Sequence, residues 1–155
     1  MKTELPPIGQ YALQQRLNRE GSSEVWRAYD SGARRTALIK FFRTDGSDVP
    51  ASLDNYVHTV ERVAALHHAN IVPIYDVHIL PSQGSSASVS LICLAIKYVE
   101  GSNLTDYIRT ISVTGKQPPA GDVISIFTPI AQALEVAHRN SIAHGNLKPS
   151  NILFE

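Results

Sequence analysis

The last twelve residues of the chain constrain its fold more than any other stretch. They begin with a polar loop, residues 144–151, and end in a short apolar run, residues 152–154. A loop rich in histidine, lysine and carboxamide side chains suits a site that must hold polar groups rigidly. The apolar run predicts a short buried strand directly after the loop.

The composition indicates a globular protein. A chain of 155 residues with 43% hydrophobic residues is long enough to bury a core, most simply as one domain. Fourteen basic and fourteen acidic residues cancel, so no global charge favours a nucleic-acid or membrane partner. The N-terminus has no apolar core for a signal peptide, and no apolar run approaches the length of a membrane span. We therefore expect a cytoplasmic protein. Its single cysteine, Cys93, lies in an apolar run and is expected to be a buried thiol.

The first two thirds of the chain predict a small sheet with one helix. Alternating and apolar runs predict five strands, and helical spacing of apolar residues predicts one amphipathic helix. The expected strands are residues 11–17, 24–30, 36–42, 71–80 and 89–98, the helix is residues 53–64, and the turns or loops are residues 18–23, 31–35, 45–50 and 81–88. On the third strand, Ala37, Ile39 and Phe41 share one face, and Leu38, Lys40 and Phe42 share the other.

The remainder is predicted to be helical. Ser102 is a candidate N-cap for a short helix that carries Leu104, Ile108 and Ile111. After a loop over residues 114–121, a longer helix is expected over residues 122–140, and Pro129 inside it predicts a kink. One face of this longer helix is apolar, with Val123, Phe127, Ile130, Leu134 and Ala137.

The final loop resembles the catalytic loop of serine/threonine protein kinases, H-R-D-L-K-P-x-N. Six of the eight positions match: His144, Leu147, Lys148, Pro149, the free position at Ser150, and Asn151. Gly145 stands in place of the arginine, and Asn146 stands in place of the catalytic aspartate.

The resemblance extends over residues 11–155 and implies an α+β fold. It implies a kinase-like small lobe over residues 11–98, made of a five-stranded antiparallel sheet and one helix, after a lead-in over residues 1–10. Residues 99–155 would then hold the hinge and the first helices of the large lobe, up to the catalytic loop. The magnesium-binding D-F-G segment and the rest of the large lobe have no counterpart in this sequence. The resemblance is therefore to a truncated kinase domain of the bacterial serine/threonine type.

Several family positions for nucleotide binding hold unusual residues. Leu17 and Val25 flank the glycine-rich turn, but the three glycines of G-x-G-x-x-G are replaced by Asn18, Glu20 and Ser23. A carboxylate at Glu20 would repel a triphosphate, and a lone Gly21 is usually only a turn residue.

Lys40 occupies the position of the phosphate-binding strand lysine. Alternatively, Lys40 is an ordinary strand lysine whose ammonium group is exposed to water. Leu38 would fill the ceiling of the adenine pocket. Thr59 stands where the lysine's glutamate partner belongs, and Glu61 lies about 200° away round the helix.

The hinge and the loop complete the implied site. Ile96 resembles the gatekeeper, and residues 97–99, ending at Val99, would offer backbone groups to adenine; the alternative is a buried strand running into a turn. In the loop, Asn146 cannot accept a proton as an aspartate does. Lys148 could still meet a γ-phosphate, and Asn151 could hold Mg²⁺ weakly, although these side chains could instead satisfy the loop's own backbone.

The resemblance implies ATP and Mg²⁺ as cofactors, and the replaced residues predict that both bind weakly or not at all. We expect a catalytically inactive, pseudokinase-like scaffold or interaction module that needs a protein partner or a large-lobe segment. The alternative is the N-terminal part of an ATP-dependent serine/threonine protein kinase. A decayed gene product without function is a third possibility.

Overall fold

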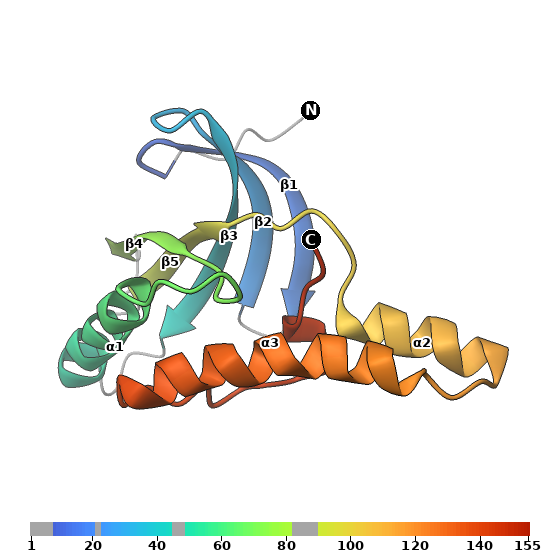
Figure 1. Cartoon of the computed structure of the whole chain (residues 1–155). Helices are drawn as coiled ribbons and strands as arrows, with labels where there is room; N and C mark the ends of the chain where they lie inside the picture. The colour runs from blue at the N-terminus through green and yellow to red at the C-terminus, as the bar shows by residue number, and fades with distance from the viewer. Residues whose placement is uncertain (1–7, 21–22, 45–48, 82–89) are drawn as a thin grey trace. The chain divides into compact units, whose positions relative to one another are not determined.

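The computed structural model describes residues 8–20, 23–44, 49–81 and 90–155 (Figure 1). The chain divides into two compact units, one of Met1–Ala65 and Val72–Tyr98, the other of Leu66–Ile71 and Val99–Glu155. Residues 1–7 of the expected lead-in, residues 45–48 of the expected loop, and residues 82–89 lie outside the described residues.

The first unit contains a five-stranded antiparallel sheet, as the sequence predicts. The strand order is β1-β2-β3-β5-β4. The strands are β1 Tyr11–Glu20, β2 Ser23–Asp30, β3 Arg35–Thr44, β4 Ile74–Pro81 and β5 Ser90–Lys97. The fourth strand begins three residues later than predicted, because the Ile71 amide closes a turn on the His68 carbonyl instead of entering the sheet.

The main cluster of buried residues in this unit, its core cluster, lies on one face of the sheet. Alternate side chains on a strand point to opposite faces, so burial of Ala37, Ile39 and Phe41 places Leu38 and Lys40 on the opposite face, as predicted. Cys93 is buried in the same core, and burial raises the pKa of its thiol to about 12. The core residues are Ile8, Tyr11, Ala28, Ala37, Ile39, Phe41, Cys93 and Ala95.

The helix α1, Val49–Ala64, packs on the face opposite the core cluster, the face that carries Phe42. The Tyr56 ring meets the Phe42 ring edge-on at 6.3 Å between centroids, and Val60 is buried. The helix was predicted to start at residue 53, but it starts at Val49, within the predicted loop. Pro50 does not prevent this, because a proline is tolerated in the first helical turn, where amide groups have no intrahelical acceptor.

A buried carboxylate fixes the turn between β2 and β3. Asp30 is fully buried, accepts a hydrogen bond from the Ala33 amide at 3.0 Å and pairs with Arg35 Nε at 3.1 Å. The Arg35 guanidinium in turn lies 3.3 Å from the centre of the Tyr75 ring on β4. The Ala33 amide, together with Arg35, holds the pKa of Asp30 below its usual value, although burial opposes this shift. This cluster therefore ties the hairpin to the far edge strand.

The second unit is helical and begins with α2, Leu104–Thr114. Its N-cap is Asn103 rather than the predicted Ser102. The Asn103 side chain accepts from the Asp106 amide at 3.1 Å, and the Asp106 carboxylate accepts from the Asn103 amide at 3.4 Å. This reciprocal pair satisfies two free amides of the first turn, which a cap at Ser102 could not do in the same register.

The long helix α3, Ala120–Arg139, contains Pro129 and begins two residues before its predicted start. The kink predicted at Pro129 stays a prediction. Within the part of the chain that the structure describes, α3 is long and apolar enough to cross a membrane by length and composition alone. The sequence analysis predicted no such stretch. Core helices of soluble proteins satisfy the same measure, so this property alone does not identify a membrane protein.

We expect Asp30→Asn to lower the thermal stability of the first unit, because the neutral amide loses the charge-assisted pair with Arg35. A depressed pKa contributes stability that is fully present above the ordinary carboxyl value and fades as the pH falls below it toward the native pKa. The wild-type midpoint of unfolding should therefore fall more steeply with acid than that of Asp30→Asn. Thermal unfolding from pH 7 to pH 2, with the exposed Glu61→Gln as control, measures this. Parallel curves for wild type and Asp30→Asn would contradict it.

Candidate functional site

One face of the sheet collects most of the predicted nucleotide-binding residues. Val25 pairs with Lys40, and Leu38 pairs with Ile96, so all four share this face and are half-buried. Leu17 lies at an irregularity of β1, between Arg16 and Asn18, and is 42% exposed. The structure therefore brings Val25 and Lys40 together and leaves Leu17 at the edge of the group.

Lys40 has an aromatic neighbour instead of an acidic one. Its Nζ lies 4.9 Å from the centre of the Phe42 ring, a cation–π distance. Among the described residues no carboxylate lies within ion-pair distance of Lys40. Thr59 is exposed and donates its hydroxyl to the Asn55 carbonyl within its own helix. The lysine therefore lacks the carboxylate that would fix its position.

The turn between β1 and β2 is shorter than predicted. Both strands extend into the predicted turn, with Asn18 opposite Val25 and Glu20 opposite Ser23. Residues 21–22 and the side chain of Glu20, where repulsion of phosphate was expected, lie outside the described residues. Asn18 and Ser23 are therefore sheet residues and not part of an open glycine-like loop.

Arg27 is a member of this face that sequence reasoning missed. It pairs with Leu38 on β3, and its Cζ lies 5.4 Å from the centre of the Tyr98 ring. Alternation along β2 could have placed it beside Val25 and Lys40, because residues 25 and 27 must share a face.

In the second unit, the catalytic-like loop is held by two side chains. His144 Nδ1 accepts from the Asn146 amide at 3.2 Å, and Asn151 Nδ2 donates to the Asn146 carbonyl at 2.8 Å. Gly145 has a φ of 69°, in the left-handed region that favours glycine. The backbone of Asn146 is therefore fixed from both sides.

The predicted site residues of the loop differ in what they bind. The side chains of Asn146 and Lys148 are exposed, with no hydrogen-bond partner within the described parts of the chain. Asn151 uses an N–H on the Asn146 carbonyl, which leaves its oxygen as an acceptor for a cation. The backbone-satisfying interpretation therefore holds for His144 and Asn151, but not for Asn146 and Lys148.

The segment after the loop is not the buried strand that the sequence predicts. Leu153 forms an isolated bridge with Asn103 and is 44% exposed. A short 3₁₀ helix, Pro149–Asn151, precedes it. The Leu104 amide donates to the Ile152 carbonyl and the Phe154 amide to the Ser102 carbonyl, both at 2.9 Å. These two hydrogen bonds and the single bridge join residues 102–104 to residues 152–154 without forming a strand pair. Val99, the predicted hinge residue, belongs to this unit and is half-buried.

Gly101 makes this pairing possible. Its φ is 155°, and a Cβ at this position would overlap the carbonyl oxygen of Phe154. The Phe154 ring also meets the Tyr107 ring edge-on at 5.9 Å between centroids. A glycine before α2 therefore allows the chain that leaves the loop to lie against it.

The chemistry open to these residues is limited. Asn146 is a neutral amide and cannot act as a general base. Among the described residues, no group of three or more histidine, cysteine, aspartate or glutamate side chains could hold a metal ion. Asn151 therefore offers one amide oxygen to Mg²⁺, which normally takes a carboxylate as well.

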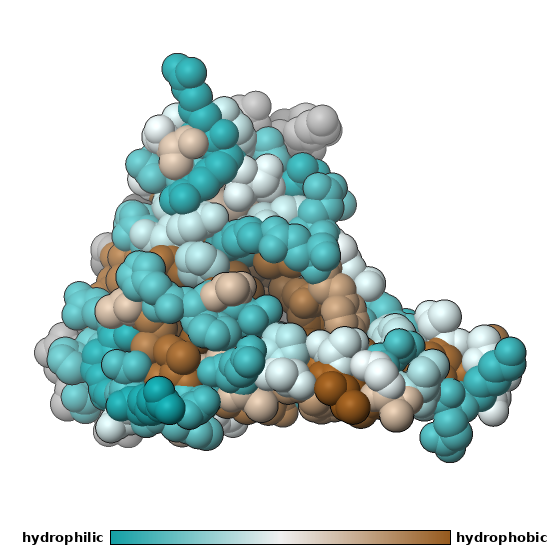
Figure 2. Space-filling model, viewed as in Figure 1, coloured by the Kyte–Doolittle hydropathy of each residue, from teal (hydrophilic) through white to brown (hydrophobic). Residues whose placement is uncertain are grey.

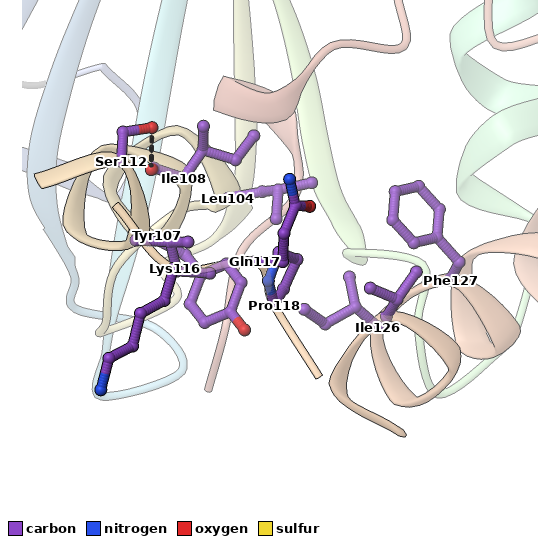
Figure 3. Close-up of a pocket in the computed structure, with 11 residues that line it drawn as sticks. Leu104, Tyr107, Ile108, Ser112, Lys116, Gln117, Pro118, Ile126 and Phe127 are labelled. Atoms are coloured by element: carbon purple, nitrogen blue, oxygen red, sulfur yellow. Dashed lines mark hydrogen bonds between the residues drawn. The ribbon is translucent and has the colours of Figure 1, made fainter. Parts of the chain in front are cut away.

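An apolar pocket of about 320 Å³ lies between α2 and α3 (Figure 3). The side chains of Ile126 and Phe127 on α3 and of Leu104 on α2 border it. The predicted apolar face of α3 is incompletely covered: Phe127 is 52% exposed, Val123 is also exposed, and Ile130 and Leu134 are half-buried. Figure 2 shows apolar surface along α3. The sequence predicted the apolar face of α3 but not the pocket.

We predict that Gly101→Ala destabilises the second unit by about 1–3 kcal/mol, because the new Cβ displaces Phe154 and strains the backbone. Hydrogen exchange at the Leu104 and Phe154 amides should accelerate. Gly121→Ala is the matched control, since its Cβ would meet no atom within 4 Å. Unchanged protection in Gly101→Ala would show that the close approach does not constrain the loop.

Comparisons with known proteins find similarity to bacterial serine/threonine-protein kinases. The chain is 32% identical over 143 residues to serine/threonine-protein kinase PknB of Mycobacterium leprae, which covers 92% of this chain and 22% of that protein. It is 31% identical over 157 residues to the probable serine/threonine-protein kinase PknB of Bifidobacterium longum, covering 99% of this chain and 22% of that protein. Serine/threonine-protein kinase PksC of Streptomyces coelicolor is 27% identical over 145 residues, 94% of this chain and 25% of that protein.

The chain thus spans between a fifth and a quarter of the length of these relatives. The family model described as the protein kinase domain matches residues 11–155. The chain belongs to the protein kinase domain family.

Proposed function

We propose that this part of a protein kinase domain is catalytically silent by itself and acts as a scaffold or interaction module. The observation that supports the proposal most strongly is that Asn146 has a fixed backbone and a neutral, exposed side chain. Its backbone is fixed by His144 and Asn151, yet the side chain presented to solvent is a neutral amide. A loop of this kind positions a group that cannot take a proton from a substrate hydroxyl.

The first unit supports the same proposal. Phosphoryl transfer depends on positioning and charge neutralisation, which a lysine held by a carboxylate supplies in the family. Here Lys40 lies over the Phe42 ring, and the helix position expected for its partner is the exposed Thr59. Among the described residues, no carboxylate lies close enough to orient the lysine.

We expect the purified chain to show no metal-dependent transfer of labelled phosphate to generic protein substrates. The Lys40→Ala variant sets the background, and the prediction is that wild type does not exceed it. Transfer above that background would contradict the proposal.

ATP and Mg²⁺ should bind weakly or not at all. Leu38 lies beside Ile96 on the face where the adenine ring would rest, so its side chain takes up volume that the base needs. We expect Leu38→Ala to improve ATP affinity about tenfold if removal of this side chain contributes about 1.4 kcal/mol. Isothermal calorimetry with Thr36→Ala as control measures the change. Tight binding by wild type, or equal affinities, would count against this account.

A partner surface is the second part of the proposal. Ile124 and Phe127 are 65% and 52% exposed on α3, although burying such side chains stabilises a protein by roughly 1.5–3 kcal/mol each. Exposed apolar surface of this kind typically marks an interface or an aggregation site. We propose that a protein partner, or a further large-lobe segment, covers it.

The double substitution Ile124→Gln with Phe127→Gln should raise the solubility of the chain and reduce its self-association, while the first unit stays folded. Analytical ultracentrifugation over a range of concentrations measures this. Substituting the exposed Thr128 and Gln132 with alanine on the same helix provides the control. If the wild-type chain is monomeric and its α3 amides are fully protected from hydrogen exchange, the proposal that this face of α3 is uncovered is wrong.

The alternative function is ATP-dependent phosphorylation of protein hydroxyls by a longer protein with this chain as its N-terminal part. Two observations favour this alternative. The chain matches 22 to 25% of the length of these relatives, and apolar side chains of α3 are exposed. An in-frame D-F-G-like segment downstream in the coding sequence would support this alternative over the scaffold.

A further inference from the structure

The turn at the start of β1 lies against a histidine from the opposite edge strand of the sheet. Ile8 and Tyr11 exchange two backbone hydrogen bonds, of 3.0 and 2.9 Å, and both side chains are buried in the core cluster. Gly9 has a φ of 56°, and a Cβ at this position would lie 3.4 Å from Cε1 of His78 on β4. The Tyr11 ring meets the His78 ring edge-on at 6.0 Å between centroids. Residues 8–11 therefore rest on the imidazole of a strand with which β1 does not pair.

The imidazole of His78 lies beside a carboxylate without forming a hydrogen bond to it. Its Nε2 atom is buried and lies 3.0 Å from Oδ2 of Asp76, but the two groups are not aligned as a hydrogen bond requires. The other oxygen of Asp76, Oδ1, accepts from the Val77 amide at 2.8 Å, which keeps the carboxylate in place. Among the described residues, Nε2 of His78 has no hydrogen-bond partner.

This contact is attractive only when the imidazole is charged. A neutral imidazole presents at Nε2 either an unpaired N–H or a lone pair that faces the carboxylate oxygen, and both are unfavourable in a buried position. A protonated imidazole places a positive charge 3.0 Å from the carboxylate of Asp76. Histidine is the side chain whose charge ordinarily changes between about pH 5 and 8, so acid should strengthen the contact.

The ionisable groups that neighbouring strands place around the histidine and Tyr11 do not change charge over that range. Cys93 lies opposite the histidine in the register of β4 and β5, and burial raises the pKa of its thiol to about 12. Burial also raises the pKa of the Tyr11 phenol, so both groups stay neutral. Asp30 and Arg35, whose charges also act on Tyr11, pair with each other at 3.1 Å. The charge that directly faces the imidazole is the carboxylate of Asp76.

We propose that His78 and Asp76 form a pH-sensitive latch that holds residues 8–11 on the sheet. Proton uptake by the imidazole tightens the latch, and proton loss loosens it. The latch joins the start of β1 to β4, the two edge strands of the sheet, and so regulates how firmly the beginning of β1 is attached. Because the Asp76 side chain is 42% exposed, water screens the pair and the effect is modest. The latch does not depend on the proposed catalytic silence.

The test measures hydrogen exchange of the Ile8 and Tyr11 amides in the full chain at about pH 5.5 and about pH 8. Each rate is divided by the rate of an unstructured amide at the same pH, which gives the protection of that amide. We expect protection at Ile8 and Tyr11 to be about two- to fivefold higher at the lower pH. Protection of the paired amides of β2 and β3 should change less. The ring-proton signals of His78 and the protection at Ile8 should follow the same titration curve.

Substitutions identify the groups responsible. Asp76→Asn keeps the shape of the side chain without its charge, so it should abolish the pH dependence of protection at Ile8. His58→Gln removes an exposed histidine from α1 and is the matched control. This control should keep the pH dependence of the wild type, because His58 has no part in the latch.

Three results would overturn the proposal: equal protection at both pH values in the wild type, an unchanged pH dependence in Asp76→Asn, or a rise of the same size at the paired amides of β2 and β3. If Asp76→Asn does not fold, His78→Gln supplies the comparison. Glutamine is polar but stays neutral, so protection at Ile8 in this variant should not depend on pH. A pH dependence equal to that of the wild type would again exclude the latch.

Discussion

Alternation along β3 is the constraint on which the first unit depends. Burial of Ala37, Ile39 and Phe41 leaves no choice but to place Leu38, Lys40 and Phe42 on the opposite face. A shift of one residue would bury Lys40 in the core, where an unpaired ammonium is strongly unfavourable. The hydrophobic pattern of one strand therefore fixes both the core and the composition of the candidate nucleotide face.

In the second unit, backbone hydrogen bonds hold the end of the catalytic-like loop. The Leu104–Ile152 and Phe154–Ser102 bonds tie the end of the catalytic-like loop to the start of α2. His144 and Asn151 form hydrogen bonds with the backbone of Asn146, and the Asn146 side chain has no hydrogen-bond partner among the described residues. The side chains of His144 and Asn151 hold the loop, and the residue at the position of the family's catalytic aspartate is a neutral amide, Asn146.

How well the sequence predicts each part of the fold depends on whether that part is determined by neighbouring residues or by residues far apart in the chain. Strands and faces depend on local periodicity, so the five strands, the helix α1 and the two faces of β3 were predicted. The N-cap was wrong by one residue, because Ser102 and Asn103 are both good caps and only the reciprocal bond with Asp106 distinguishes them. The strand expected at residues 152–154 was wrong, because a strand needs a partner of its own length, which an apolar run does not reveal.

The candidate site was predicted unevenly for the same reason. Val25 and Lys40 were found through motif positions and lie together. Arg27 fits no motif, and only alternation along β2 could have placed it on the same face as Val25. The cation–π contact of Lys40 with Phe42 is likewise a consequence of residues 40 and 42 sharing a face. The pocket between α2 and α3 depends on the packing of two helices, which no single segment encodes.

The central claim is that the backbone hydrogen bonds of the loop do not depend on whether residue 146 is a neutral amide or a carboxylate. Hydrogen exchange in Asn146→Asp measures this most directly. The amides to follow are those of Asn146, Leu104 and Phe154, which donate to His144, Ile152 and Ser102. The account predicts that protection at Leu104 and Phe154, and at residue 146 itself, stays as in wild type. Loss of protection at these amides would show that the neutral side chain of Asn146 is needed to hold the loop, and would contradict the account.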